Sequence, residues 1–215
     1  MTATTRWAVY AAVPLLVVAA VALVFVLRSS PAASPSANAA APASTEAAAT
    51  WPAGKKAAPP ISLRDEHGRA VSLASLRGRP VLVTFIDPLC RDFCPTEALH
   101  LSEAVRGAKV KPTILAVSVN TAGNAPANLA LDRRKWNVVP QWTWGVGSGA
   151  ALAHVWKRYG IEVLVTKKKV AGVRVQQVAH TEAAYLIDAH GFERALFIWP
   201  YTADAVSKEL AATTS

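Results

Sequence analysis

The stretch VLVTFIDPLCRDFCP, residues 81–95, holds the features that decide the fold. Five of its first six residues are apolar, and the six are largely β-branched or aromatic, which predicts a buried central strand. Its last residue is a proline suited to the first position of a helix, so residues 96–105 are expected to be helical. Cys90 and Cys94, the only cysteines of the chain, lie between the two elements. The stretch therefore predicts a strand, a loop and a helix, with both thiols at the strand-to-helix junction.

Outward from this stretch, the hydrophobic pattern alternates between strand and helix periods. The predicted strands are 61–63, 70–73, 112–119, 161–165, 173–179, 183–187 and 194–198, and the further helices are 128–135, 149–159 and 202–210. The run Lys167–Lys169 is expected in the loop of a hairpin between two of these strands. A strand-helix-strand unit followed by hairpins and a helix predicts an α/β sandwich with a mixed sheet flanked by helices.

The N-terminal part of the chain divides into an anchor and a linker. Residues 7–27 carry no charge, and as a helix they would span about 30 Å, the thickness of a bilayer core. A cleavable signal peptide has a shorter apolar region, so we expect residues 1–28 to be an uncleaved membrane anchor, although cleavage stays open. Residues 29–60 are rich in Ala, Pro and Ser, which predicts a linker. The folded domain is expected at 61–215.

A short N-terminal tail favours an N-inside, C-outside topology, so the folded domain is expected outside the cytoplasm, tethered to the cell membrane by a single span. The net charge is +9. The lysine run has no interleaved aromatic residues, so it argues against nucleic-acid binding. A basic face can instead help docking on an acidic protein or an anionic lipid.

Two thiols at a strand-to-helix junction can do redox chemistry or bind a soft metal. If Cys94 is the helix N-cap, the helix dipole favours a thiolate there. A structural role as buried thiols or an inert disulfide is the alternative. A metal would want a third ligand, and the single methionine is residue 1. Among five histidines, His180 stands out because it ends one apolar strand and precedes another, where it is either structural or a ligand. Asp87 either tunes the thiols or caps the loop.

Several segments together resemble the Sco/SenC family of membrane-anchored copper chaperones with a thioredoxin-like fold. The family pattern is a Cys-x-x-x-Cys-Pro run after a strand, with a distant His-Thr or His-Ser before a Tyr-Leu-Ile-Asp-x-x-Gly strand and turn. The matching segments here are CRDFCP at 90–95, HT at 180–181, YLIDAHG at 185–191, LASLRGRP at 73–80 and AVSV at 116–119. The resemblance covers essentially residues 61–210.

The resemblance implies a copper ion bound by Cys90, Cys94 and His180. It also implies a metallochaperone that assists assembly of the binuclear copper centre of cytochrome c oxidase. The partner would then be the copper-bearing oxidase subunit or another extracytoplasmic copper or thiol protein. Two thiolates and one imidazole suit Cu(I), a soft ion.

An enzymatic alternative stays open. A membrane-tethered thiol-disulfide oxidoreductase would use Cys90 and Cys94 as its catalytic pair to reduce disulfides of a partner protein. The Cys-x-x-x-Cys spacing differs from the Cys-x-x-Cys of ordinary thioredoxins. A thiol peroxidase is a third reading, but it needs a Thr or Ser and an Arg around its cysteine that the sequence does not clearly supply.

Overall fold

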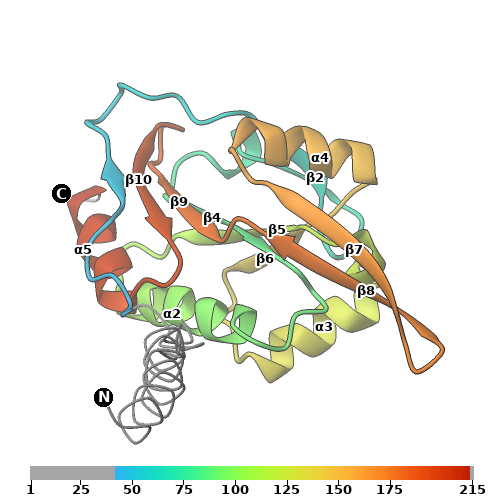
Figure 1. The fold of residues 1–215 in the computed structure, drawn as a ribbon. Coiled ribbons are helices and arrows are strands. Elements are labelled where there is room, and N and C mark those ends of the chain that lie inside the picture. The colour runs from blue at the N-terminus through green and yellow to red at the C-terminus, as the bar shows by residue number, and fades with distance from the viewer. Residues whose placement is uncertain (1–41, 214–215) are drawn as a thin grey trace, which may run out of the picture. The chain divides into compact units, whose positions relative to one another are not determined.

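The computed structural model describes residues 42–213 of the chain (Figure 1). The predicted anchor, residues 7–27, lies outside the described residues. Within residues 42–213 no helix is long and apolar enough to cross a membrane.

A six-stranded mixed sheet forms the centre of the domain. In spatial order its strands are β1 (Ala49–Thr50), β10 (Glu193–Ile198), β9 (Ala183–Ile187), β4 (Val81–Ile86), β5 (Thr113–Ser118) and β6 (Trp142–Gly145). The β4, β5 and β6 strands are parallel, and the other neighbours are antiparallel. Every residue of β4 and β5 is buried, as expected for central strands covered on both faces. The prediction of a mixed sheet is therefore confirmed.

Helices cover both faces of this sheet, which gives the predicted α/β sandwich (Figure 1). One face packs on α2 (Cys94–Gly107), α3 (Pro126–Lys135) and α5 (Ala203–Thr213), and the other on α4 (Gly149–Arg158) and the hairpin of β2 (Ser62–Arg64) and β3 (Ala70–Ser72). Short 3₁₀ turns, η1 (Ala74–Leu76) and η2 (Thr121–Gly123), complete the element list. Each face has its own apolar core. The core on the α2 face includes Cys94, so this thiol is held by the packing of the domain.

A second hairpin, β7 (Val163–Val170) and β8 (Val173–His180), forms a separate two-stranded sheet (Figure 1). Its turn, Ala171–Gly172, has positive φ at both residues, 48° and 83°. The prediction that Lys167–Lys169 lies in the loop was wrong, because these residues are paired within β7. The lysines are exposed, so extending the hairpin through them requires no burial of charge. The longer strands place His180 at the base of a projecting arm.

The described part of the predicted linker, residues 42–60, contacts the domain. Ala49 and Thr50 add an edge strand to β10, and the Lys56 ammonium lies 2.7 Å from the Glu193 carboxylate and 3.6 Å from the centre of the Trp51 ring. These residues of the predicted linker therefore pack on the domain that was expected to begin at residue 61. Backbone hydrogen bonds account for the added strand, since a segment of small residues can extend a sheet without apolar side chains.

Candidate metal centre

The cysteine loop joins the end of β4 to the start of α2. The helix begins at Cys94, and Phe93 rather than Cys94 is its N-cap, which corrects the predicted cap by one residue. Cys94 is fully buried and Cys90 is half-buried. Both thiols are free, and they are hydrogen-bonded to each other. The loop therefore presents one accessible sulfur and keeps the second directly behind it.

The two thiols differ strongly in acidity. The hydrogen bond from Cys94 lowers the pKa of Cys90 to about 6, and backbone N–H groups of Cys94 and Asp92 contribute in the same direction. The same bond, together with burial, raises the pKa of Cys94 well above its ordinary value. At neutral pH the pair therefore holds one proton on Cys94 and a thiolate on Cys90.

Asp87 links the cysteine loop to two other segments. It is buried, and its Oδ1 accepts hydrogen bonds from the Leu89 backbone N–H (2.8 Å) and from Asn120 Nδ2 (3.0 Å). Asn120 Oδ1 in turn accepts from Gln176 Nε2 of β8 at 3.3 Å. Asp87 thus caps the loop, and through Asn120 it also connects the loop to the hairpin that carries His180.

His180 is the last residue of β8 and is half-buried. Its Nδ1 lies 3.0 Å from the Thr181 carbonyl oxygen. A carbonyl can only accept, so this contact assigns the proton to Nδ1 and leaves the Nε2 lone pair available. Burial lowers the pKa of His180, which favours the neutral imidazole that a metal requires.

One pocket of about 390 Å³ brings the cysteine loop and β8 together. Cys90 and His180 both line it, and Cys94 lies behind Cys90. Its other ionisable lining residues are Asp87, Arg91, Asp92 and Glu182. Burial raises the pKa of Glu182 to about 8, so this group is largely protonated at neutral pH. The donors suit a soft cation, and the Cys90 thiolate, Asp87 and Asp92 against the Arg91 guanidinium give a negative lining. Among residues 42–213, however, no three His, Cys, Asp or Glu side chains form a group close enough to hold a metal ion.

The sequence matches the family model described as SCO1/SenC over residues 51–215. The chain belongs to the SCO1/SenC family. A search of the curated proteins finds no match. The family predicted from the cysteine run and the distant histidine is therefore confirmed, and the match begins ten residues before the predicted domain start.

Solved structures of Sco proteins share the fold. Copper-bound ScoI of Bradyrhizobium japonicum is 26% identical, with a TM-score of 0.63 over 73% of this chain and 99% of that chain. Copper-bound yeast Sco1 is 19% identical, with a TM-score of 0.64 over 74% of this chain and 88% of that chain. BsSco, a member of the Sco family of cytochrome c oxidase assembly proteins with a disulfide switch, is 19% identical, with a TM-score of 0.60 over 79% of this chain and 98% of that chain. These matches support the thioredoxin-like fold and copper as the ion of the family.

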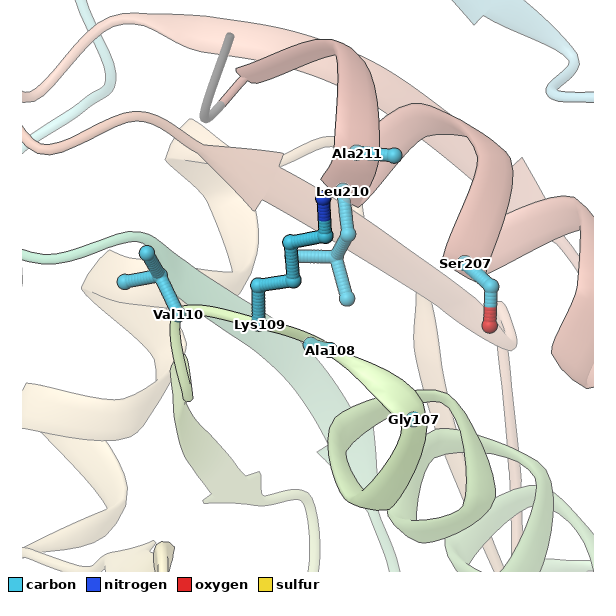
Figure 2. A pocket seen from close by; sticks show the side chains of 7 residues that line it. All are labelled: Gly107, Ala108, Lys109, Val110, Ser207, Leu210 and Ala211. Atoms are coloured by element: carbon cyan, nitrogen blue, oxygen red, sulfur yellow. The ribbon is translucent and has the colours of Figure 1, made fainter.

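A second hollow of about 390 Å³ in this Sco chain lies between the C-terminal end of α2 and α5 (Figure 2). Its lining residues are Gly107, Ala108, Lys109, Val110, Ser207, Leu210 and Ala211. It has no thiol, imidazole or carboxylate among them. This hollow therefore offers no ligand for a soft metal ion.

Sequence reasoning missed a buried carboxyl group beneath the Sco cysteine pair. Glu97 is 1% exposed, and its Oε1 accepts hydrogen bonds from Thr84 Oγ1 (2.7 Å) and the Tyr201 hydroxyl (2.9 Å). Burial raises the pKa of Glu97 to about 7. The sequence shows only an acidic residue in the first helical turn, where exposed carboxylates are common.

Replacing Glu97 with glutamine is expected to stabilise the protein at pH 8 and to change little at pH 4.5. The folded pKa of Glu97 lies above the ordinary value of 4.5, so the wild type loses stability as pH rises from about 4.5 to 7. Glutamine keeps the oxygen that accepts from Thr84 and Tyr201 but carries no charge. The expected gain at pH 8 is on the order of 1–3 kcal/mol, measured by urea unfolding at both pH values.

The matched control is Glu103→Gln, because Glu103 is exposed on the same helix. That variant should show no comparable difference between the two pH values. An equal effect of Glu97→Gln at pH 4.5 and pH 8 would contradict the assignment of a buried, protonatable group.

Proposed function

We propose that this chain is a copper metallochaperone that holds copper through Cys90, Cys94 and His180. It delivers the ion to the copper-bearing subunit of cytochrome c oxidase and so assists assembly of the binuclear copper centre. The observation that carries the proposal is the pocket shared by Cys90 and His180, with Cys94 behind, in a chain of the SCO1/SenC family. Copper in similar Sco structures supports the choice of ion.

The residues of the pocket have distinct roles in this proposal. The Cys90 thiolate is the entry ligand, since it is the accessible sulfur and carries the charge. Cys94 becomes the second ligand by releasing its proton, and His180 supplies a neutral nitrogen from β8. A site of three ligands leaves one side of Cu(I) open for transfer to a partner. Because the three side chains are not preassembled, binding requires the loop and the hairpin to approach each other.

The same proposal includes the membrane. An uncleaved anchor at residues 7–27 would hold the domain outside the cytoplasm, at the surface of the cell membrane, where a membrane-bound oxidase presents its copper centre. The remaining linker residues would allow the domain to reach the partner.

A second candidate function is favoured by the unequal acidity of the thiols. In a thiol-disulfide reductase the Cys90 thiolate attacks a sulfur of the partner disulfide, and one partner thiolate leaves. Cys94 then loses its proton to solvent and attacks Cys90, which releases the second partner thiolate and leaves a Cys90–Cys94 disulfide. Reduction of a disulfide-bonded oxidase peptide by a copper-free protein would support this reading.

The copper proposal is tested by titrating the reduced full-length chain, in detergent, with Cu(I) against a chromophoric chelator. The expected result is one tightly bound ion per chain. The His180→Ala variant should bind at least about tenfold more weakly, because it removes a ligand from a three-ligand site.

His190→Ala is the matched control, since His190 is exposed in the turn between β9 and β10. It should bind copper as the parent protein does. Unchanged affinity in His180→Ala would remove His180 from the ligand set, and absence of Cu(I) binding by the wild type would refute the copper function.

A further inference from the structure

Asp132 of α3 is a buried carboxylate that the proposed copper chemistry does not use. It is 0% exposed, and neither of its oxygens has a hydrogen-bond partner among the described residues. Burial raises the pKa of Asp132 to about 6, opposed by the charges of Arg91 and Lys135. A buried carboxylate without hydrogen bonds is costly unless a cation lies next to it. The cation next to Asp132 therefore shows which part of the structure this carboxylate holds in place.

That cation is Arg91, which lies between the two cysteines of the loop. Its Nη1 is 3.3 Å from Asp132 Oδ1. The same nitrogen donates to the carbonyl oxygens of Cys90 (2.7 Å) and Pro88 (3.1 Å). Nη1 thus donates to two carbonyl oxygens of the loop and forms an ion pair with Asp132, so the guanidinium bridges the loop to α3. Asp132 thus reaches the backbone of Cys90 through one side chain.

The loop is also bounded on its other side. A Cβ atom at Gly123 of η2 would lie 2.8 Å from Pro88 Cβ and 3.1 Å from Leu89 Cγ. The loop therefore packs closely on η2, while Arg91 draws it toward α3. Between the Asp87 cap and the start of α2, the Arg91–Asp132 pair is the ionic contact that joins the middle of the loop to another element.

We propose that Asp132, acting through Arg91, is a positioning residue that fixes the Cys90 carbonyl and hence the Cys90 sulfur opposite Cys94 and His180. The inference rests on the proposed copper function for its metal readout. In this proposal the distance between the Cys90 and Cys94 sulfurs also depends on the Arg91–Asp132 pair, because a loop released from α3 lets Cys90 move away from Cys94. The pair therefore governs both Cu(I) affinity and the ease of forming a Cys90–Cys94 disulfide.

The test uses Asp132→Asn and Arg91→Lys in the full-length chain in detergent. Asparagine keeps the shape of Asp132 without its charge, and lysine keeps the charge of Arg91 without the forked guanidinium. Each variant is expected to weaken Cu(I) binding about tenfold, the lower end of the effect of outer groups on metal sites. Each should also shift the thiol-disulfide equilibrium about tenfold toward the dithiol, which is about 30 mV for a two-electron couple.

The double variant should lose no more Cu(I) affinity than either single variant, because both substitutions break the same Arg91–Asp132 contact. The matched control is Glu66→Gln, which breaks the 3.1 Å Arg133–Glu66 ion pair at the neighbouring residue of α3, away from the cysteine loop. It should lower stability without moving either site readout. The inference would be overturned if the two single variants lost Cu(I) affinity additively in the double variant. It would also be overturned if Glu66→Gln shifted the thiol-disulfide equilibrium as much as Asp132→Asn does.

The two readouts separate the inference from the proposed function. If the wild type binds no Cu(I), the copper function fails, and the disulfide equilibrium still decides the role of Asp132. If Asp132→Asn fails to fold, the half-exposed Arg91 allows Arg91→Lys to decide it. An unshifted disulfide equilibrium in that variant would refute the positioning role.

Discussion

The Cys90→Ser and Cys94→Ser variants are each expected to lose more than about 100-fold in Cu(I) affinity, beyond the usual effect of changing an outer group. A hydroxyl is a hard, neutral ligand, whereas Cu(I) prefers soft thiolates. The two variants should differ in stability. Cys90 is half-buried, so its serine variant should fold normally, whereas Cys94 lies in the apolar core and its serine variant should lose about 1–2 kcal/mol. Cu(I) competition and urea unfolding measure the two effects.

Ala98→Ser is the matched control for the buried hydroxyl. Ala98 is fully buried in the same core, one turn along α2. The Ala98→Ser variant should lower stability by about as much as Cys94→Ser does and leave Cu(I) affinity nearly unchanged. A Cys94→Ser protein that binds Cu(I) as tightly as the parent would eliminate Cys94 as a ligand and leave the reductase function as the better reading of the pair.

The elements that sequence predicted best are those with strong local signals. The apolar run before the cysteine loop became β4 at residues 81–86 as expected, since a fully buried strand needs no alternation. The proline after Cys94 placed the start of α2 to within two residues. The β9 strand and its hairpin with β10 were also predicted, because the turn Asp188–Gly191 separates two apolar runs.

The elements that sequence missed depend on tertiary contacts. The β6 strand, with sequence WTWG, is four residues long, and it is a strand because β5 pairs with it and both tryptophans enter the core. The β1 strand has two small residues and exists only through its bonds to β10. The paired lysines of β7 give no apolar pattern at all. Propensity is a weak guide where the partner strand decides the structure.

The candidate site shows the same division. The cysteine pair and His180 stood out as residues, but only the path of β8 places His180 in the pocket of Cys90. No local pattern indicated that Glu97 is buried or that Arg91 meets Asp132, 41 residues away on α3. Contacts between distant segments are set by the fold, and a single sequence gives no direct signal for them.

At pH 7, iodoacetamide is expected to modify Cys90 more than about 100-fold faster than Cys94, because the thiolate is the nucleophile and Cys94 is both protonated and buried. The pKa of Cys90 is lowered to about 6 from 9.0, so its alkylation rate should rise between pH 5 and 7 and then level off. Arg91 lies between the cysteines, so trypsin separates them and mass spectrometry can follow each rate.

The cause of the lowered pKa can be tested at Cys94 itself. The hydrogen bond from Cys94 is the largest cause. Cys94→Ser keeps a hydroxyl donor, so the midpoint of the pH dependence of Cys90 alkylation should stay near that of the parent. Cys94→Ala removes the donor and should raise the midpoint by about one unit or more. If both variants kept the midpoint of the parent, the backbone N–H groups of the loop, rather than the Cys94 side chain, would hold the thiolate. A parent midpoint near 9 would contradict both explanations, the Cys94 hydrogen bond and the backbone N–H groups. It would also weaken the reductase function, which depends on a Cys90 thiolate at neutral pH.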